Sequence, residues 1–156
     1  MGNLNAGVAL GRRIIEDLRP SALGNLGLVA TLEILAREFA RNPGVQMHCT
    51  LEPVQLSPAA ELMAYRLVQE ALTNISKYAH AANVWIDMAT RGDMVSVSVR
   101  DDGVGFDTEA PRLAAYGLLG MRFRVEAEGG VLMLESAPEQ GTLVRVTLPQ
   151  SAAQPA

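Results

Sequence analysis

The segment of residues 94–101, MVSVSVRD, alternates between apolar and polar side chains. Successive side chains of a β-strand point to opposite faces, so Val95, Val97 and Val99 share one face and polar residues share the other. A strand of this kind belongs to a sheet that is buried on one side only. The segment therefore predicts helices grouped on one face of a sheet, which is a two-layer α/β sandwich.

The other predicted elements agree with an α+β fold class, in which a helix precedes a mixed, largely antiparallel sheet. Ser57 and Pro58 suit the start of the longest helix, because serine caps a helix end and proline fits its first turn. Helices are expected at about 26–41, from 58 onward and at 118–128, and strands at 45–52, 83–90, 94–101, 131–136 and 142–149. A hairpin at 91–93 joins two of these strands.

Composition limits the classes of partner and compartment. A chain of 156 residues that is 49% hydrophobic suits one domain with a real core. The net charge of -4, without a basic run, argues against nucleic acid as a partner. The single cysteine, Cys49, excludes an internal disulfide and favours a reducing compartment. No apolar stretch approaches the roughly 18 residues of a membrane span, and no signal-peptide pattern is present. We expect a cytoplasmic chain without direct membrane contact, in a parent protein that could itself be membrane-anchored.

A further helix is predicted for residues 4–19, before Pro20, which cannot continue a helix. Its apolar positions recur at spacings of four and three, as in a coiled-coil seam, and are Leu4, Val8, Gly11, Ile15 and Leu18. The spacing leaves two hypotheses open. The helix either packs on its own domain or forms one strand of an intermolecular bundle.

Three polar or glycine-rich patterns have both a structural and a functional interpretation. Glu70, Asn74 and Lys77 share a helix face, which is either solvated surface or a site for Mg²⁺ and phosphate. DDGVGFD, at 101–107, is either a surface turn or a backbone that lies against a ligand. GLLGM, at 117–121, begins a helix whose free N–H groups can receive an anion.

The order of these motifs is more informative than any one of them. QEALTNISKYA, DDGVGFD, GLLGM and GTLVRVTLP follow one another as in the ATP-binding domain of sensor histidine kinases, which this chain resembles from about Arg12 to Pro149. That superfamily also includes gyrase, heat-shock chaperone ATPases and MutL, and has a Bergerat-type fold. IIEDLRPSALGNLGLVATL resembles the end of the dimerisation helix and the linker of the nitrate-sensor-like subfamily. A P-loop pattern is absent, and DDGVGFD lacks the third glycine of a dinucleotide fingerprint.

The resemblance implies a role in nucleotide binding for each matching residue. At the adenine end, Asp102 would accept a hydrogen bond from the exocyclic amine, and Thr142 would support the base. Gly103 and Gly105 would let the backbone approach the nucleotide, which a β-carbon would block.

At the phosphate end, the resemblance makes Asn74 a ligand of Mg²⁺ and brings Lys77 and Tyr78 near the phosphates. Glu70 would contact Mg²⁺ through water. The remaining matching residues would form the mobile lid's flank and the helix start that meets phosphate; they are Gly117, Leu118, Gly120 and Met121.

The chain departs from close relatives in two places and contains no evident phosphate acceptor. Tyr78 stands where histidine is frequent, and Ala114-Ala115-Tyr116 replaces a glycine-rich stretch, which makes the lid less flexible. His48 lies in a predicted strand and His80 follows the longest helix, so neither suits the acceptor role. The acceptor histidine is expected on an upstream helix that this sequence does not contain.

We therefore predict a remnant of the dimerisation helix and linker at 1–22, an ATP-binding catalytic domain at 23–150, and a disordered tail at 151–156. The expected function is transfer of the γ-phosphoryl of Mg-ATP to histidine, with a response regulator as partner and a homodimer as the full-length state. One alternative is a serine kinase of the anti-sigma-factor type, against which the segment EDLRPSAL argues. The other is a nucleotide-binding regulatory module without transferase activity.

Overall fold

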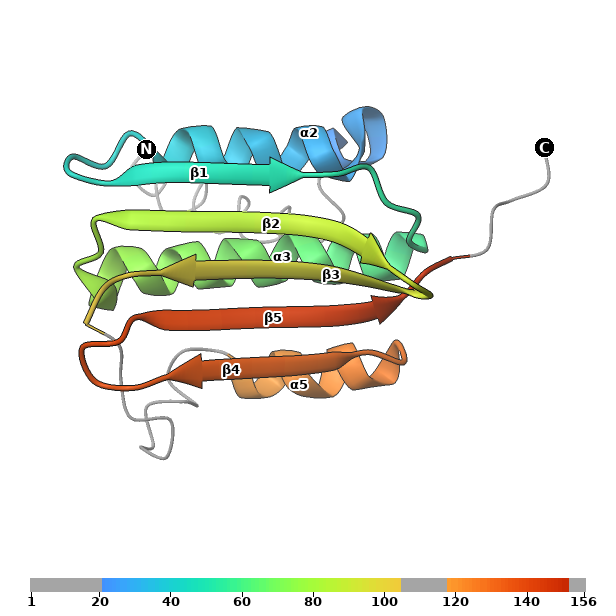
Figure 1. The fold of residues 1–156 in the computed structure, drawn as a ribbon. Coiled ribbons are helices and arrows are strands. Elements are labelled where there is room, and N and C mark those ends of the chain that lie inside the picture. Colours follow the sequence, from blue (N-terminus) through green and yellow to red (C-terminus); the bar gives the residue numbers. More distant parts are fainter. Residues whose placement is uncertain (1–20, 105–117, 152–156) are drawn as a thin grey trace, which may run out of the picture.

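The computed structural model describes residues 21–104 and 118–151. One of its layers is a mixed five-stranded sheet (Figure 1). Its strands are β1 (Gln46–Leu51), β2 (Asn83–Arg91), β3 (Met94–Asp101), β4 (Val131–Ser136) and β5 (Thr142–Pro149). They are ordered β1-β2-β3-β5-β4. β1 pairs with β2 in parallel, and every other pair is antiparallel.

The helices form the second layer, on a single face of the sheet. Figure 1 shows α2 (Ser21–Phe39), α3 (Pro58–Asn74) and α5 (Leu118–Ala127) together behind the strands. A π-helical turn, η1 (Ile75–Ala79), continues α3. The predicted two-layer α+β architecture is thus confirmed. None of the described helices combines the length and apolarity needed to cross a bilayer.

The described elements agree with the predicted ones to within two residues, except at α2. This helix begins at Ser21 rather than near Leu26, and Gly27 interrupts it with a non-helical backbone (φ 87°, ψ 170°). The start of α3 is as predicted, since Ser57 Oγ accepts the Ala60 N–H at 3.1 Å. The predicted N-terminal helix lies outside the described residues, as does the predicted disordered tail beyond Ser151. The N–H of Ser151 itself donates to the Gln55 carbonyl at 2.8 Å.

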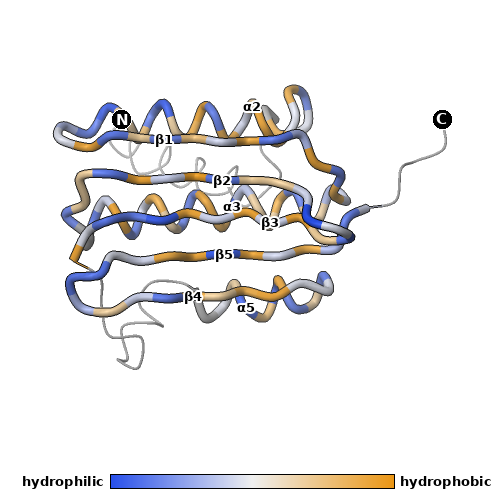
Figure 2. Tube along the Cα trace, in the orientation of Figure 1, coloured by the Kyte–Doolittle hydropathy of each residue, from blue (hydrophilic) through white to orange (hydrophobic). Residues whose placement is uncertain are grey.

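The hydrophobic core lies between the central strands and α3. Val95, Val97 and Val99 are at most 1% exposed, as their alternation predicts. Figure 2 shows apolar and polar residues alternating along the strands. The inner face of α3 supplies six buried residues, which are Ala60, Ala64, Leu67, Val68, Ala71 and Leu72.

Two polar residues of β3 are also buried, one on each face. Ser98 is 6% exposed and lies between Asp87 and Arg145 in the strand register. On the face without helices, Ser98 is therefore covered by side chains of the sheet itself. Asp101 is 4% exposed and continues the face of the three valines. The sheet therefore ends with a carboxylate on its helix-covered side.

Candidate functional site

Asp101, the last residue of β3, is the buried acid of the candidate site. Its Oδ1 accepts the Gly103 N–H at 2.8 Å, and Gly103 is the one donor to this carboxylate among the described residues. Burial raises the pKa of Asp101; the Gly103 hydrogen bond opposes this effect, and the charge of Asp102 adds to it. A buried acid with one oxygen that no described residue donates to is suited to bind a polar ligand group.

The start of β5 packs directly on the backbone of Asp101. Thr142 pairs with Asp101 in the antiparallel register, and its Oγ1 lies 2.9 Å from Ser136 Oγ. Gly141 has φ 75°, and a β-carbon there would lie 2.1 Å from the Asp101 carbonyl oxygen. Glycine at 141 is therefore required twice, by backbone conformation and by the close approach of the two chains.

Asp102, the neighbour of Asp101, is exposed, and its carboxylate is used by the chain itself. Its Oδ1 accepts the N–H groups of Ala82 and Asn83, both at 2.9 Å, and its Oδ2 accepts Asn83 Nδ2 at 3.0 Å. The hydrogen bond from the Asn83 side chain is the main cause that lowers the pKa of Asp102. Asp102 is thus an ionised carboxylate with both oxygens occupied.

These environments favour Asp101 over Asp102 as the acid that meets a ligand. The adenine role that the family resemblance gives to Asp102 stays a prediction. The sequence did contain a signal for Asp101. Its position continues the alternation of Val95, Val97 and Val99, which places it on the core face, while Asp102 falls after the strand.

The predicted polar stripe is present on α3 and η1. Burial raises the pKa of the half-buried Glu70, and the positive charge of Lys77 opposes this effect. Lys77 is therefore within electrostatic reach of Glu70, as a shared helix face requires. Asn74 is half-buried at the last position of α3, between these two residues.

The π-helical turn η1, which follows Asn74, was not predicted. Such turns add one residue to a helical turn and are frequent at functional sites. Lys77 lies in η1, which ends at His80 in the left-handed conformation (φ 51°). Tyr78 also belongs to η1, but its side chain is outside the described part of the structure.

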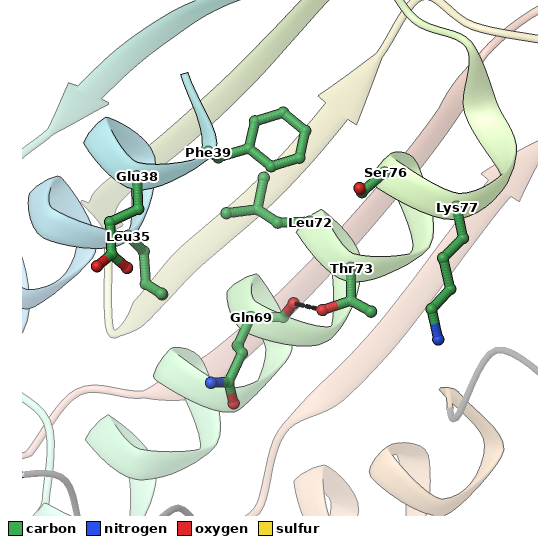
Figure 3. Close-up of a pocket in the computed structure, with 8 residues that line it drawn as sticks. All are labelled: Leu35, Glu38, Phe39, Gln69, Leu72, Thr73, Ser76 and Lys77. Atoms are coloured by element: carbon green, nitrogen blue, oxygen red, sulfur yellow. Dashed lines mark hydrogen bonds between the residues drawn. The ribbon is translucent and has the colours of Figure 1, made fainter. Parts of the chain in front are cut away.

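A cavity of about 310 Å³ lies where α2 packs beside α3 and η1 (Figure 3). It is lined by Leu35, Glu38, Phe39, Gln69, Leu72, Thr73, Ser76 and Lys77. Figure 3 shows the Lys77 side chain pointing away from Leu35 and Phe39 of α2. The Lys77 ammonium is accordingly directed away from α2. The apolar side of the cavity, formed by Leu35, Phe39 and Leu72, therefore has no group that would bind a charged ligand.

A second cavity, of about 220 Å³, lies between α3 and α5 and brings three predicted site residues together. It is lined by Met63, Arg66, Gln69, Glu70, Gly120, Met121 and Arg124. A β-carbon at Gly120 would meet nothing within 4 Å, so the protein's own packing does not require glycine there. Glu70, Gly120 and Met121 therefore surround one polar opening that contains two arginines.

The predicted adenine-end residues Asp101, Asp102 and Thr142 line a third cavity, a groove of about 570 Å³ whose wall also includes Trp85 and Arg100 from the face of the sheet without helices. Gly103 is buried beside them. The chain that leads from Val104 to Leu118 connects this end to α5, and the predicted site residues Gly105 and Gly117 fall within it, outside the described residues. Leu118 begins α5, but its side chain is not described.

The family model of "Histidine kinase-, DNA gyrase B-, and HSP90-like ATPase" matches residues 59–152, which contain all of these site residues. The chain belongs to this ATPase family. Its match covers α3, the β3 end, α5 and the Gly141-Thr142 pair. Within the family, the chain carries the ATPase domain of sensor histidine kinases of two-component signalling, as the curated relatives indicate.

One of these relatives is the signal transduction histidine-protein kinase/phosphatase DegS of Brevibacillus brevis, which is 34% identical over 140 residues. The alignment covers 88% of this chain and 36% of DegS. The oxygen sensor histidine kinase NreB of Staphylococcus carnosus is 33% identical over 141 residues, with 88% and 41% coverage. The chain thus spans about two fifths or less of these two relatives.

Solved structures of low sequence identity share the fold. The histidine kinase domain of the Erythrobacter litoralis EL346 blue-light activated histidine kinase superposes with a TM-score of 0.67 at 21% identity, covering 79% of this chain and 61% of that chain. Acinetobacter baumannii histidine kinase AdeS gives a TM-score of 0.66 at 16% identity, with 95% and 82% coverage. This likeness extends the agreement in fold to proteins whose sequences have diverged widely.

Proposed function

We propose that this ATPase domain binds Mg-ATP with the adenine at Asp101 and the phosphates beside α3, η1 and the start of α5. In the intact protein it transfers the γ-phosphoryl group to a histidine on an upstream helix. The observation that carries the proposal is the buried Asp101 carboxylate, which ends β3 on the helix-covered face. This carboxylate supports a site that recognises a planar base by accepting a hydrogen bond from it.

The contacts of Asp101 match the chemistry of adenine. With Oδ1 held by the Gly103 N–H, Oδ2 is left to accept a hydrogen bond from the exocyclic amine. Guanine and hypoxanthine have a carbonyl oxygen at the equivalent position, which would face the carboxylate without a proton between them. Thr142, held by Ser136, lies opposite Asp101 in the register and supports the base from β5.

The residues available for Mg²⁺ fit an ion that arrives with the nucleotide. Within the described ranges, no group of three His, Cys, Asp or Glu residues could hold a metal by itself. Asn74 offers a neutral amide oxygen, and Glu70, one turn earlier on the same face, can hold a metal-bound water. The remaining ligands would be phosphate oxygens and water. Bound Mg²⁺ would neutralise phosphate charge, while Lys77 supplies a positive charge beside it.

The wider role is proposed from the named relatives. A response regulator would receive the phosphoryl group, and residues 1–22 would be the remnant of a helix that dimerises in a longer, cytoplasm-facing protein. The catalytic domain would occupy residues 23–150. The relatives described above are named as histidine kinases, which supports this function over a serine kinase of the anti-sigma-factor type.

The test is calorimetric titration of the chain with ATP and with inosine triphosphate, whose base has a carbonyl in place of the amine and a proton on N1. Asp101→Asn would turn an amide NH₂ toward the adenine amine and keep the size of the side chain. A hydrogen bond to a charged group contributes about 1.5–3 kcal/mol, so ATP affinity should fall roughly tenfold or more. Asp93→Asn, the same substitution on an exposed residue before β3, is the control. Unchanged ATP affinity in Asp101→Asn would refute the adenine assignment.

A further inference from the structure

The Asp102 carboxylate joins two segments that are about twenty residues apart in the chain. We call the contacts of Asp102 with Ala82 and Asn83 the junction. The carboxylate accepts three hydrogen bonds of 2.9–3.0 Å from Ala82 and Asn83. In return, the Asp102 N–H donates to the Asn83 carbonyl at 3.3 Å. These contacts extend the pairing of β2 with β3 beyond its last pair, Val84 and Asp101. One residue thus holds the two segments together at four points where the strands end.

The two segments carry the two halves of the proposed nucleotide site. Ala82 comes three residues after the end of η1, the turn that contains Lys77. Asp102 stands between Asp101, the proposed adenine acid, and Gly103, whose N–H orients that acid. The junction therefore sets the distance between the part that reads the base and the part that meets the phosphates.

A second set of contacts on the open face of the sheet holds Asn83 in the orientation that Asp102 needs. Asn83 Oδ1 lies 3.0 Å from His48 Nε2, which leaves Asn83 Nδ2 to face Asp102. The His48 ring stacks on Trp85 with centroids 5.4 Å apart and planes 18° apart. The Arg100 guanidinium lies 4.2 Å from the centroid of a Trp85 ring, as in a cation–π contact.

We propose that Asp102 is a positioning residue for nucleotide binding, which holds the Asp101 turn at a set distance from η1 through Ala82 and Asn83. Asn83, supported by His48, is its partner in this role. The inference rests on the proposed function, since it needs adenine at Asp101 and phosphates near η1. Binding of a linked base and phosphate is strengthened when both subsites are held at the spacing of the ligand, because the ligand then binds both without strain.

A charge swap separates positioning from direct contact. Asn83→Asp places two carboxylates against each other and should weaken ADP binding by roughly three- to thirtyfold, the usual range for residues that act through neighbours. Adding Asp102→Asn restores a donor and an acceptor across the junction. The amide introduced at position 102 can donate to the carboxylate introduced at position 83, and its oxygen can still accept from the backbone. The double variant should recover ADP affinity to within about threefold of wild type. An acid at position 83 could not replace a direct contact of Asp102 with adenine.

The ligand can be divided in the same way as the site. Adenosine alone and tripolyphosphate alone each occupy one half, so NMR titrations should give similar affinities for wild type and Asn83→Asp. Only ADP and ATP, which need both halves, should lose affinity. If adenosine alone loses as much as ADP, or if the double swap fails to recover, the positioning role is refuted.

Failure of the wider proposal would look different. A wild-type chain that does not bind ADP would overturn both the nucleotide site and the role of Asp102. Normal wild-type binding that is insensitive to Asp101→Asn would refute the adenine assignment. Wild-type binding that falls in Asp101→Asn but not in Asn83→Asp would refute the positioning role alone. Thermal melts of all variants separate these outcomes from loss of the fold, and the double swap remains decisive if the single variant does not fold.

Discussion

Replacing Gly141 by alanine should destabilise the domain for two reasons, the backbone conformation of this residue and its close approach to Asp101. The two effects together should exceed either one alone. The residue has φ 75°, a conformation that disfavours any side chain with a β-carbon. The added carbon would also lie 2.1 Å from the Asp101 carbonyl oxygen and 3.2 Å from Asp102 Cα. These atoms are backbone atoms at the β3–β5 pairing, so they cannot rotate away as a flexible side chain could.

The expected magnitude follows from these two contributions. The left-handed conformation costs an alanine roughly 1–2 kcal/mol. The overlap must open by about 1 Å to reach a tolerable contact, and overpacking of this kind costs typically about 1–3 kcal/mol. The sum is about 2–5 kcal/mol. At roughly 3–5 °C per kcal/mol for a domain of this size, the melting temperature should fall by roughly 6–25 °C.

Two other glycines separate the contributions, and thermal unfolding followed by circular dichroism is the assay. Gly44 has φ 81° and nothing within 4 Å of an added β-carbon, so Gly44→Ala tests the conformation alone. At Gly130 the added β-carbon would lie 2.4 Å from the Thr147 carbonyl oxygen, without a positive φ, so Gly130→Ala tests the overlap alone. Gly141→Ala should lower the melting temperature more than Gly44→Ala does. Equal shifts for these two variants would refute the close approach to Asp101.

Three further predictions concern the site. Because burial raises the pKa of Asp101 above its ordinary 3.8, the native chain takes up this proton at a higher pH than the unfolded chain. Lowering the pH through that pKa should therefore increase the free energy of unfolding through this residue and weaken ATP binding. In calorimetry across pH, the free energy of unfolding and the ATP affinity should both depend less on pH in Asp101→Asn than in wild type. Asn74→Ala should reduce ATP affinity more with Mg²⁺ than without it; equal losses in calorimetry would contradict a ligand role. Incubation with γ-labelled ATP should leave the chain unlabelled and label an added acceptor-histidine helix slowly, whereas self-labelling that disappears in His80→Ala would show that the acceptor is here.

Local patterns were sufficient to predict the elements and their layers. The alternation of β3 identified the buried face, because side-chain direction in a strand has a period of two whatever the strand pairs with. Ser57 and Pro58 located the start of α3 for an equally local reason, since the cap involves only the next three residues. The polar stripe of Glu70 and Lys77 was likewise a consequence of helical spacing, and the charge effect between the two residues supports it.

Only the tertiary structure distinguished Asp101 from Asp102 by their contacts. The partners of Asp102 are Ala82 and Asn83, and the residue packed on Asp101 is Gly141, some forty residues further along the chain. Such contacts depend on how β2, β3 and β5 are registered, which no single segment encodes. The same holds for Asn83 and His48, whose hydrogen bond joins strands β1 and β2. Periodicity determines the face on which a side chain lies, but its partner is determined by the pairing of distant strands, and that pairing is what brings Ala82 and Asn83 to the carboxylate of Asp102.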